Sequence, residues 1–266
     1  MTMDTETEPP LADASPQAAV KTLGKALALL GLVGRAEHPP TIGELAVQAG
    51  LSRPTTHRLV QTLVGAGFLQ QGKRDGRLSV GLAVLPLAAS LLDTHRLRVE
   101  ALPHLQGLAQ RINARVNLGI QHQQRIMILG GAEKPNLPGI YSRFGRTVPM
   151  HCCALGKAIL AYLPQAEVQA ILAEQPLVAR TPNTLTTVPA LLADLERTRQ
   201  RGWSTEFREN TPTSCCIGVP VLDASELPAA AISIAGRSIE QLEREIEPVL
   251  ETAELISHLL QRTAAN

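Results

Sequence analysis

The sequence has few aromatic residues: Phe, Tyr and Trp make up 2% of its 266 residues. A platform for single-stranded nucleic acid stacks bases on several exposed rings, so a protein of that kind is not expected. Hydrophobic residues still make up 44% of the chain, and its cores must consist mainly of Leu, Ala, Val and Ile. The length exceeds what one small DNA-binding module needs, which predicts two domains of unequal size.

The chain also lacks a run of about 18 uncharged apolar residues. Its first residues, MTMDTETEPPLADASP, are acidic and proline-rich rather than basic and then apolar, so no secretory leader is predicted. The expected location is therefore the cytoplasm, without a membrane partner. Residues 1–19 are expected to form a disordered acidic tail.

Patterns typical of metal sites and enzymes are missing as well. The seven histidines are scattered without metal-ligand spacing, and neither a G-x-S-x-G nor a phosphate loop occurs. His151 stands beside Cys152 and Cys153, but neighbours in sequence need not meet as nucleophile and base. No enzyme activity, metal or cofactor is predicted.

Cysteine is present only as two adjacent pairs, Cys152-Cys153 and Cys215-Cys216. This spacing fits neither a C-x-x-C zinc knuckle nor a secreted disulfide scaffold, so reduced thiols are expected. One alternative stays open: paired thiols that line a pocket would make the protein a redox or thiol-reactive sensor. Against it, cysteine often serves as a small hydrophobic core residue.

The charge is unevenly distributed, although the net charge is only +1. Residues 1–19 carry four acids and no Lys or Arg, residues 20–81 carry eight Lys and Arg against three acids, and the other 185 residues carry seventeen of each sign. The phosphate backbone of DNA attracts local positive charge. A small basic module attached to a larger neutral one therefore favours a DNA-binding regulator over an enzyme.

Residues 20–81 have the pattern of a winged helix-turn-helix. The sequence Thr41-Ile-Gly-Glu44 is typical of a capping box that opens a short helix, and Gly50 is suited to end it. Ser52 caps the next helix, and the spacing of the two helices is that of a helix-turn-helix. An amphipathic helix over residues 20–34 is predicted before them from apolar residues at helical spacing, namely Leu23, Leu27, Leu30 and Val33.

A hairpin and a connector are predicted after the helix-turn-helix. Residues 68–71 and 77–80 have the character of short strands, and the Asp-Gly pair between them favours a tight turn, so the hairpin is the predicted wing. Residues 82–112 again have a helical period. We expect a linker helix over residues 82–98 and a second, larger domain over residues 99–266.

Polar and basic side chains gather where a recognition helix meets base edges, at the turns after Ser52. Arginine can pair with guanine through two hydrogen bonds, threonine can contact thymine or phosphate, and basic residues at the wing tip can reach the backbone. His57 is expected to face phosphate or to be structural rather than to read a base. The alternative is that these are ordinary solvated side chains. The predicted DNA-binding residues are Thr41, Ser52, Arg53, Thr55, Thr56, His57, Arg58, Lys73 and Arg74.

The pattern beyond residue 115 mixes strands and helices. Apolar runs typical of strands occur at 116–121, 125–129, 216–221 and 229–235, and helical patterns occur at 152–162, 165–173, 191–201 and 239–260. This predicts an α+β fold in which a largely antiparallel sheet is flanked by helices.

Several stretches, in order along the chain, resemble the IclR family of transcription regulators. The resemblance covers about residue 20 to the C-terminal helix and rests on Leu45–Leu63, Gly145–Lys157, Arg197–Gly202, Glu209, Cys216–Pro220 and Ala230–Gly236. It implies a winged helix-turn-helix, a linker helix used in dimerisation and a GAF-like effector domain. It also implies a homodimer or homotetramer on a palindromic operator of double-stranded DNA, mostly as a repressor.

The same resemblance implies a set of effector-binding residues. Backbone amides of Ala154 and Leu155, an acid at Glu206, a thiol at Cys216 and a hydroxyl at Ser233 match the family pocket. The second expected serine is Ala235, and a usual glycine is Thr213. The lost hydroxyl makes the pocket less polar, which favours a larger or more apolar effector over a small keto-acid such as glyoxylate or pyruvate. An aromatic or small carboxylic acid is the expected effector class.

Overall fold

The computed structural model describes residues 20–112, 114–133 and 144–264, and it divides after Leu91 into two compact units. The division falls inside the stretch that the sequence assigned to a linker helix, residues 82–98. The predicted acidic tail, residues 1–19, lies outside the described residues.

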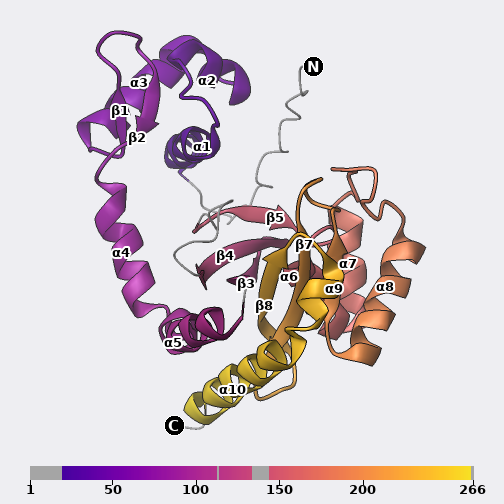
Figure 1. Ribbon diagram of the computed structural model, residues 1–266. Helices are drawn as coiled ribbons and strands as arrows, with labels where there is room; N and C mark the ends of the chain where they lie inside the picture. The colour runs from indigo at the N-terminus through magenta and orange to yellow at the C-terminus, as the bar shows by residue number, and fades with distance from the viewer. Residues whose placement is uncertain (1–19, 113, 134–143, 265–266) are drawn as a thin grey trace. The chain divides into compact units, whose positions relative to one another are not determined.

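The N-terminal unit contains a helix-turn-helix followed by a two-stranded hairpin (Figure 1). Thr41 forms the expected capping box with Glu44, Ser52 caps the next helix, and Gly50 has a left-handed φ of +62°. Each of these local signals was readable in the sequence because capping depends on neighbouring residues. The elements are α1 (Lys21–Arg35), α2 (Ile42–Gln48), α3 (Arg53–Gly65), β1 (Leu69–Gln71), β2 (Leu78–Val80) and α4 (Val84–Thr94), which continues past the division.

The buried face of α1 differs from the expected one. Leu29 and Val33 enter the core of the N-terminal unit with Leu45 and Leu59, whereas Leu23 is 57% exposed and Leu27 is 56% exposed. The helical period was right. However, several apolar stripes fit the same helix, and spacing alone does not say which one packs against the protein.

The C-terminal unit is built on a six-stranded antiparallel sheet with the strand order β5-β4-β3-β8-β7-β6. Hairpins join β3 to β4 and β7 to β8, and the pairing of β3 with β8 joins these two halves. The strands are β3 (Arg115–His122), β4 (Arg125–Ala132), β5 (Thr147–Pro149), β6 (Ser204–Phe207), β7 (Cys215–Leu222) and β8 (Pro228–Gly236).

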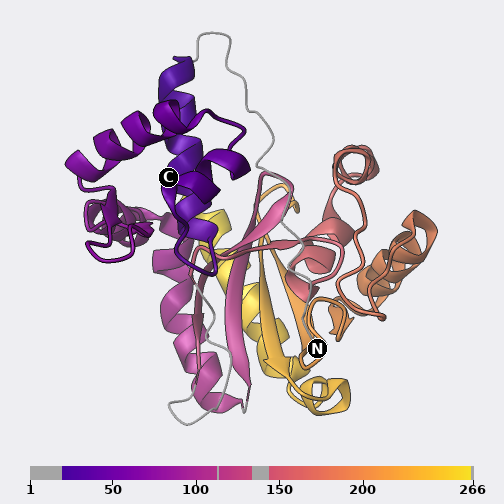
Figure 2. The same cartoon turned by 90° about the horizontal axis from the view of Figure 1, so that it is seen from above.

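Helices cover both faces of this sheet (Figure 2), and each face has its own apolar core. On one face Val116, Leu118 and Ile232 pack with α5 (Arg96–Arg111) and α10 (Ile246–Ala264), next to α9 (Ile239–Glu243). On the other face Ile126 and Ala231 pack with α6 (Ala154–Tyr162), α7 (Gln165–Glu174) and α8 (Val188–Arg201). The expected α+β fold is confirmed.

Three details differ from the sequence prediction. The short strands β5 and β6 were not predicted, the helical stretch 239–260 is divided into α9 and α10, and the connector 82–112 is divided at His95 into α4 and α5. Strands of three or four residues are too short to show a period. In the described part of the chain, no helix is long and apolar enough to cross a membrane.

Candidate functional site

The first turn of α3 presents polar and basic groups in a fixed arrangement. The Ser52 hydroxyl accepts a hydrogen bond from the Thr55 backbone N–H at 3.4 Å and donates one to the Thr55 hydroxyl at 2.9 Å. The side chains of Arg53, His57 and Arg58 are exposed. The cap thus fixes the end of the helix from which these three side chains project, as a major-groove reading helix requires.

Thr56 is the one predicted DNA-binding residue that the structure removes from this surface. Its side chain is 0% exposed, and its hydroxyl donates to the backbone oxygen of Ser52 at 3.1 Å. Adjacent residues on a helix point in different directions, and Thr56 falls on the face that Leu59 and Val60 bury. The prediction that Thr56 touches DNA was therefore wrong, because it holds the first turn of α3 from inside.

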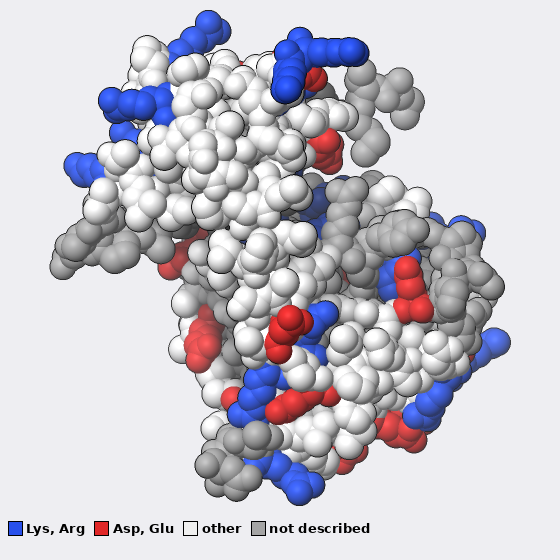
Figure 3. Space-filling view, turned by 90° about the vertical axis from the view of Figure 1, so that its left-hand side faces the viewer, with Lys and Arg blue, Asp and Glu red and all other residues white. Residues whose placement is uncertain are grey.

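Lys73 and Arg74 lie exposed in the turn between β1 and β2. The sequence did not reveal how this wing is held, which is through Arg77: its guanidinium donates to the backbone oxygen of Pro39 at 2.6 Å and lies 3.8 Å from Glu44. The Leu78 N–H also donates to the Pro40 oxygen at 2.7 Å. Figure 3 shows Lys and Arg side chains, together with a few Asp and Glu, projecting from the N-terminal unit, and side chains of both signs on the C-terminal unit.

In the C-terminal unit, the N-terminal end of α6 lies against the sheet. The Ser204 hydroxyl donates to the Ala154 oxygen at 2.6 Å, and a Cβ atom on Gly218 would lie 2.5 Å from the same oxygen. A Cβ atom on Gly119 would lie 2.8 Å from the Leu155 side chain. Small residues on β3 and β7 thus allow the first turn of α6, where helix amides point outward, to approach the sheet closely.

The strand register brings most of the predicted effector residues together. Glu206 lies opposite Cys216, and Cys216 lies opposite Ala235, so these three share one row across β6, β7 and β8. Ser233 lies two residues before Ala235 on β8 and therefore on the same face. Ala231, in the next position on that face, packs with Leu155 of α6 in the same core. The six residues therefore gather between one sheet face and the start of α6.

Glu206 is 2% exposed, and burial is the main reason why its pKa is raised from the ordinary carboxyl value. Its Oε1 accepts hydrogen bonds from the backbone N–H of Glu209 at 2.6 Å and of Asn210 at 3.1 Å. Glu206 therefore holds the segment after β6 in place, in addition to any contact with a ligand.

The cysteines have environments that suppress thiolate chemistry. Burial raises the pKa of Cys152 to about 12 and raises that of Cys153 and Cys216 well above the ordinary thiol value. Cys215 points to the opposite face of the sheet from Cys216 and donates to the Arg237 oxygen at 3.6 Å. Since the thiolate is the reactive form, this disfavours the redox alternative. Among the described residues, no group of His, Cys, Asp and Glu could hold a metal ion.

The imidazole ring of His151 contacts the backbone of Val178 rather than acting as a base beside the thiols. Its ring Nε2 lies 3.1 Å from the Val178 oxygen, and burial lowers its pKa. The ring is thus engaged with the segment after α7.

A buried cation on α6 escaped the sequence reasoning. Lys157 is 1% exposed, and its Nζ lies 2.7 Å from Glu209 Oε1 and 3.0 Å from Asp194 Oδ2. It therefore ties α6 to α8 and to the segment after β6. A single lysine in a helical pattern carries no signal of such a position, because its two partners lie 37 and 52 residues away in the chain.

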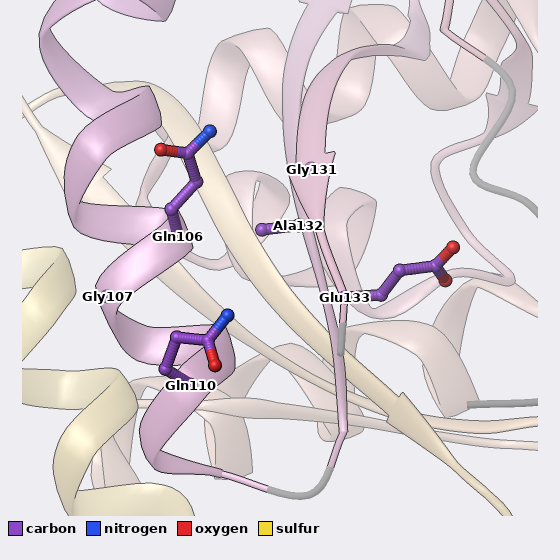
Figure 4. A pocket seen from close by; sticks show the side chains of 6 residues that line it. All are labelled: Gln106, Gly107, Gln110, Gly131, Ala132 and Glu133. Atoms are coloured by element: carbon purple, nitrogen blue, oxygen red, sulfur yellow. The ribbon is translucent and has the colours of Figure 1, made fainter. Parts of the chain in front are cut away.

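Two cavities lie elsewhere in the C-terminal unit. The larger one, of about 460 Å³, is open and lies between α5 and the end of β4 (Figure 4), and its lining is Gln106, Gly107, Gln110, Gly131, Ala132 and Glu133. The smaller one holds only about 10 Å³ and includes His151 and Leu160. Neither lining contains any of the six predicted effector residues.

Comparison with protein families decides the class. Residues 22–73 match the IclR helix-turn-helix domain, and residues 89–258 match the C-terminal domain of bacterial transcriptional regulators of the IclR type. The chain belongs to the IclR family. The resemblance noted in the sequence is thereby confirmed.

Individual members of the family match over nearly the whole chain. The glycerol operon regulatory protein of Streptomyces coelicolor is 31% identical over 88% of this chain and 92% of its own length. The transcriptional repressor IclR of Escherichia coli is 31% identical over 86% of this chain and 84% of its own length. The present chain, as a member of this family, is thus a DNA-binding transcription regulator rather than an enzyme.

Solved structures of the family share the fold. The IclR regulator of Alicyclobacillus acidocaldarius has a TM-score of 0.80 at 25% identity and covers 91% of this chain and 99% of its own. An IclR homologue of Microbacterium hydrocarbonoxydans, solved in complex with 4-hydroxybenzoate, has a TM-score of 0.75 at 25% identity and covers 90% of this chain and 98% of its own.

Proposed function

We propose that this IclR regulator is a cytoplasmic repressor of a catabolic operon that binds a palindromic operator and answers to a carboxylic acid in its C-terminal unit. The observation that carries the proposal is the basic edge of α3, where Arg53 and Arg58 project from a turn capped by Ser52. The remaining predicted contacts are Thr41, Thr55, His57, Lys73 and Arg74. The effector set is proposed as predicted: Ala154, Leu155, Glu206, Cys216, Ser233 and Ala235.

A homodimer or a homotetramer is proposed as the active form. The stretch around α4 exposes four leucines, with 80% of Leu82, 65% of Leu85, 60% of Leu87 and 51% of Leu91 accessible. Apolar side chains gathered in one exposed segment are typical of an interaction surface. A second copy would bury them, and two recognition helices would then match two operator half-sites about one helical turn, or a multiple of it, apart.

The proposed response is a shift between conformations. An effector that binds one arrangement of the dimer more tightly increases its population and so changes how the two α3 helices meet the half-sites. Linkage then requires that operator DNA change the affinity for the effector by the same factor. The bound 4-hydroxybenzoate in the homologue supports aromatic acids as the first compounds to test.

The DNA-binding half is tested with DNA that the purified protein selects from a random-sequence pool. We expect Arg53→Ala to weaken binding to this DNA by about 1–3 kcal/mol and to relax its sequence preference, because a base contact is lost. Lys73→Ala should weaken binding to selected and random DNA about equally, and Arg262→Ala, on α10, serves as the unaffected control. Equal losses on both DNAs for Arg53→Ala contradict its role as a reader.

The effector half is tested by calorimetry with and without the selected DNA. Aromatic and small carboxylic acids are first ranked by the thermal stabilisation that a native-state ligand confers. The best acid is then titrated into the free protein and into its DNA complex. Identical affinities in the two titrations refute the proposed coupling.

A further inference from the structure

Strand β3 carries two polar residues on the effector face that lie outside the predicted set. Val116 and Leu118 are buried against α5 and α10, so Arg115 and Asn117 project from the opposite face of the sheet. The Asn117 amide donates to the Ser233 hydroxyl at 3.4 Å, which places it beside a predicted effector residue. Figure 4 shows the same alternation on the neighbouring strand end, where Ala132 points toward α5 and Glu133 points away from it.

Arg115 extends the row of effector residues by one strand. The register places Arg115 opposite Ala235, which lies opposite Cys216, which in turn lies opposite Glu206. Side chains opposite each other on antiparallel strands are about 4.5–5.5 Å apart at Cβ. Only the methyl group of Ala235 stands between Arg115 and Cys216, whose backbones are separated by two strand spacings, about 10 Å.

Arg115 is the positively charged residue in the row that Glu206, Cys216 and Ala235 form across the sheet. Lys157, the buried cation of α6, is paired with Asp194 and Glu209. The Arg115 side chain is 15% exposed, and among the described residues its one hydrogen-bond partner is Glu133, which Nε reaches at 2.9 Å. Because this bond uses Nε, the two terminal nitrogens of the guanidinium group can donate to a ligand, and their forked geometry suits a carboxylate.

We propose that Arg115 pairs with the carboxylate of the effector, and that Asn117 helps to position it by holding the Ser233 hydroxyl. This inference rests on the proposed function and adds to it a specificity determinant and a direction. The acidic group of the effector lies toward β3, above Ala235, and the remainder of the molecule extends toward Cys216 and the first turn of α6. A ligand with an apolar body of about one aromatic ring spans the two strand spacings.

The test compares acids with their uncharged amides on the full-length protein. Benzoate and 4-hydroxybenzoate are each paired with the corresponding amide, and affinities are measured by calorimetry and by thermal stabilisation. The wild type should prefer the acid. Arg115→Met should weaken acid binding about ten- to a hundredfold, the effect of losing one charge-assisted contact, and should leave amide binding unchanged. Arg115→Lys should keep part of the preference, which also guards against misfolding.

Two control variants separate ligand binding from structure. Glu133→Gln breaks the same ion pair but keeps the guanidinium, so it should bind the acids at least as tightly as the wild type. Arg111→Met removes an exposed arginine that pairs with Glu251 at 2.9 Å on α10, and it should change nothing. An equal loss in Glu133→Gln and Arg115→Met overturns the proposal, because the ion pair alone would then explain the effect.

Other results overturn the proposal directly. They are an unchanged acid preference in Arg115→Met, or no binding of any of these acids to the wild type. Selected DNA distinguishes this failure from that of the proposed function. If an acid releases the selected DNA equally from the wild type and from Arg115→Met, Arg115 has no role in effector binding and the proposed regulatory function stands. If an acid binds through Arg115 without affecting DNA binding, the role of Arg115 stands and the proposed regulatory function fails.

Discussion

Replacing Lys157 by methionine should expose the cost of burying two carboxylates without their cation. The lysine is 1% exposed, while Asp194 is 9% and Glu209 is 8% exposed, and Nζ lies within 3.0 Å of both. Removing one partner of a buried ion pair costs about 3–5 kcal/mol because the remaining charge stays desolvated. For a unit of this size the expected fall in melting temperature is about 6–20 °C.

The pH dependence gives this prediction a second readout. Burial raises the pKa of Glu209, and Lys157 opposes that rise, so the pKa should rise further in Lys157→Met. A carboxyl whose pKa is higher in the folded than in the unfolded state takes up its proton first in the folded state, so stability increases as the pH falls through the folded pKa. The deficit of Lys157→Met should therefore be largest at a pH well above the folded pKa of Glu209 and shrink as the pH falls through it.

Urea denaturation at several pH values measures the deficit, and two further variants control it. Arg197→Met removes the exposed partner of Asp194, which lies 3.0 Å away, and should cost at most about 1 kcal/mol. Adding Glu209→Gln to Lys157→Met should recover part of the loss, since the two residues are coupled. A deficit no larger than that of Arg197→Met, or one independent of pH, refutes the reasoning.

Three further predictions concern the cap, the thiols and the close approach of α6. Ser52→Ala should lower the stability of the N-terminal unit by about 1 kcal/mol in a urea titration, because the Thr55 N–H loses its acceptor. Ser79→Ala, at an exposed position of β2, should change the stability little, and equal losses in the two variants contradict the capping role. Because burial raises the pKa of Cys152 to about 12, this thiol should resist iodoacetamide at neutral pH in the folded protein, whereas all four cysteines should react in urea. Mass spectrometry locates the labelled cysteines, and rapid labelling of Cys152 in the folded protein contradicts its burial. Gly218→Ala should lower the stability by about 1–3 kcal/mol, because the new Cβ would lie 2.5 Å from the Ala154 oxygen. Gly107→Ala, on α5 where an added Cβ would contact nothing within 4 Å, should be neutral or stabilising, and an unchanged stability of Gly218→Ala refutes the close contact.

The helix-turn-helix was predictable because its signals are local. Thr41 with Glu44, Gly50 and Ser52 each act on backbone groups within four residues, so the bounds of α2 and α3 follow from short stretches of sequence. Direction around a helix is a different matter. The predicted apolar stripe of α1 included Leu23 and Leu27, which are exposed, and Thr56 was predicted to bind DNA and is buried, because the buried face of a helix depends on which elements pack against it.

The effector face was predictable only in part, and for a different reason. The family resemblance pointed to residues on β6, β7, β8 and α6, and the register brings them together. The positions of Arg115, proposed to bind the effector, and of Lys157 were not predicted because they depend on partners that are remote in sequence, such as Ala235 and Glu209. Register between strands is set by the whole sheet, which spacing within one strand does not reveal.

The alternation along β3 has a consequence for how a ligand signal reaches the rest of the chain. Arg115, on the proposed ligand side, and Val116, which is buried with α5, are consecutive residues. Only the backbone of β3, which rises about 3.4 Å per residue, therefore separates the proposed ligand side of the sheet from the core around Val116, which is closely packed. A ligand that shifts the backbone at Arg115 and Asn117 also moves Val116 and Leu118, so selection for a new effector at this strand must preserve the packing of β3 against α5.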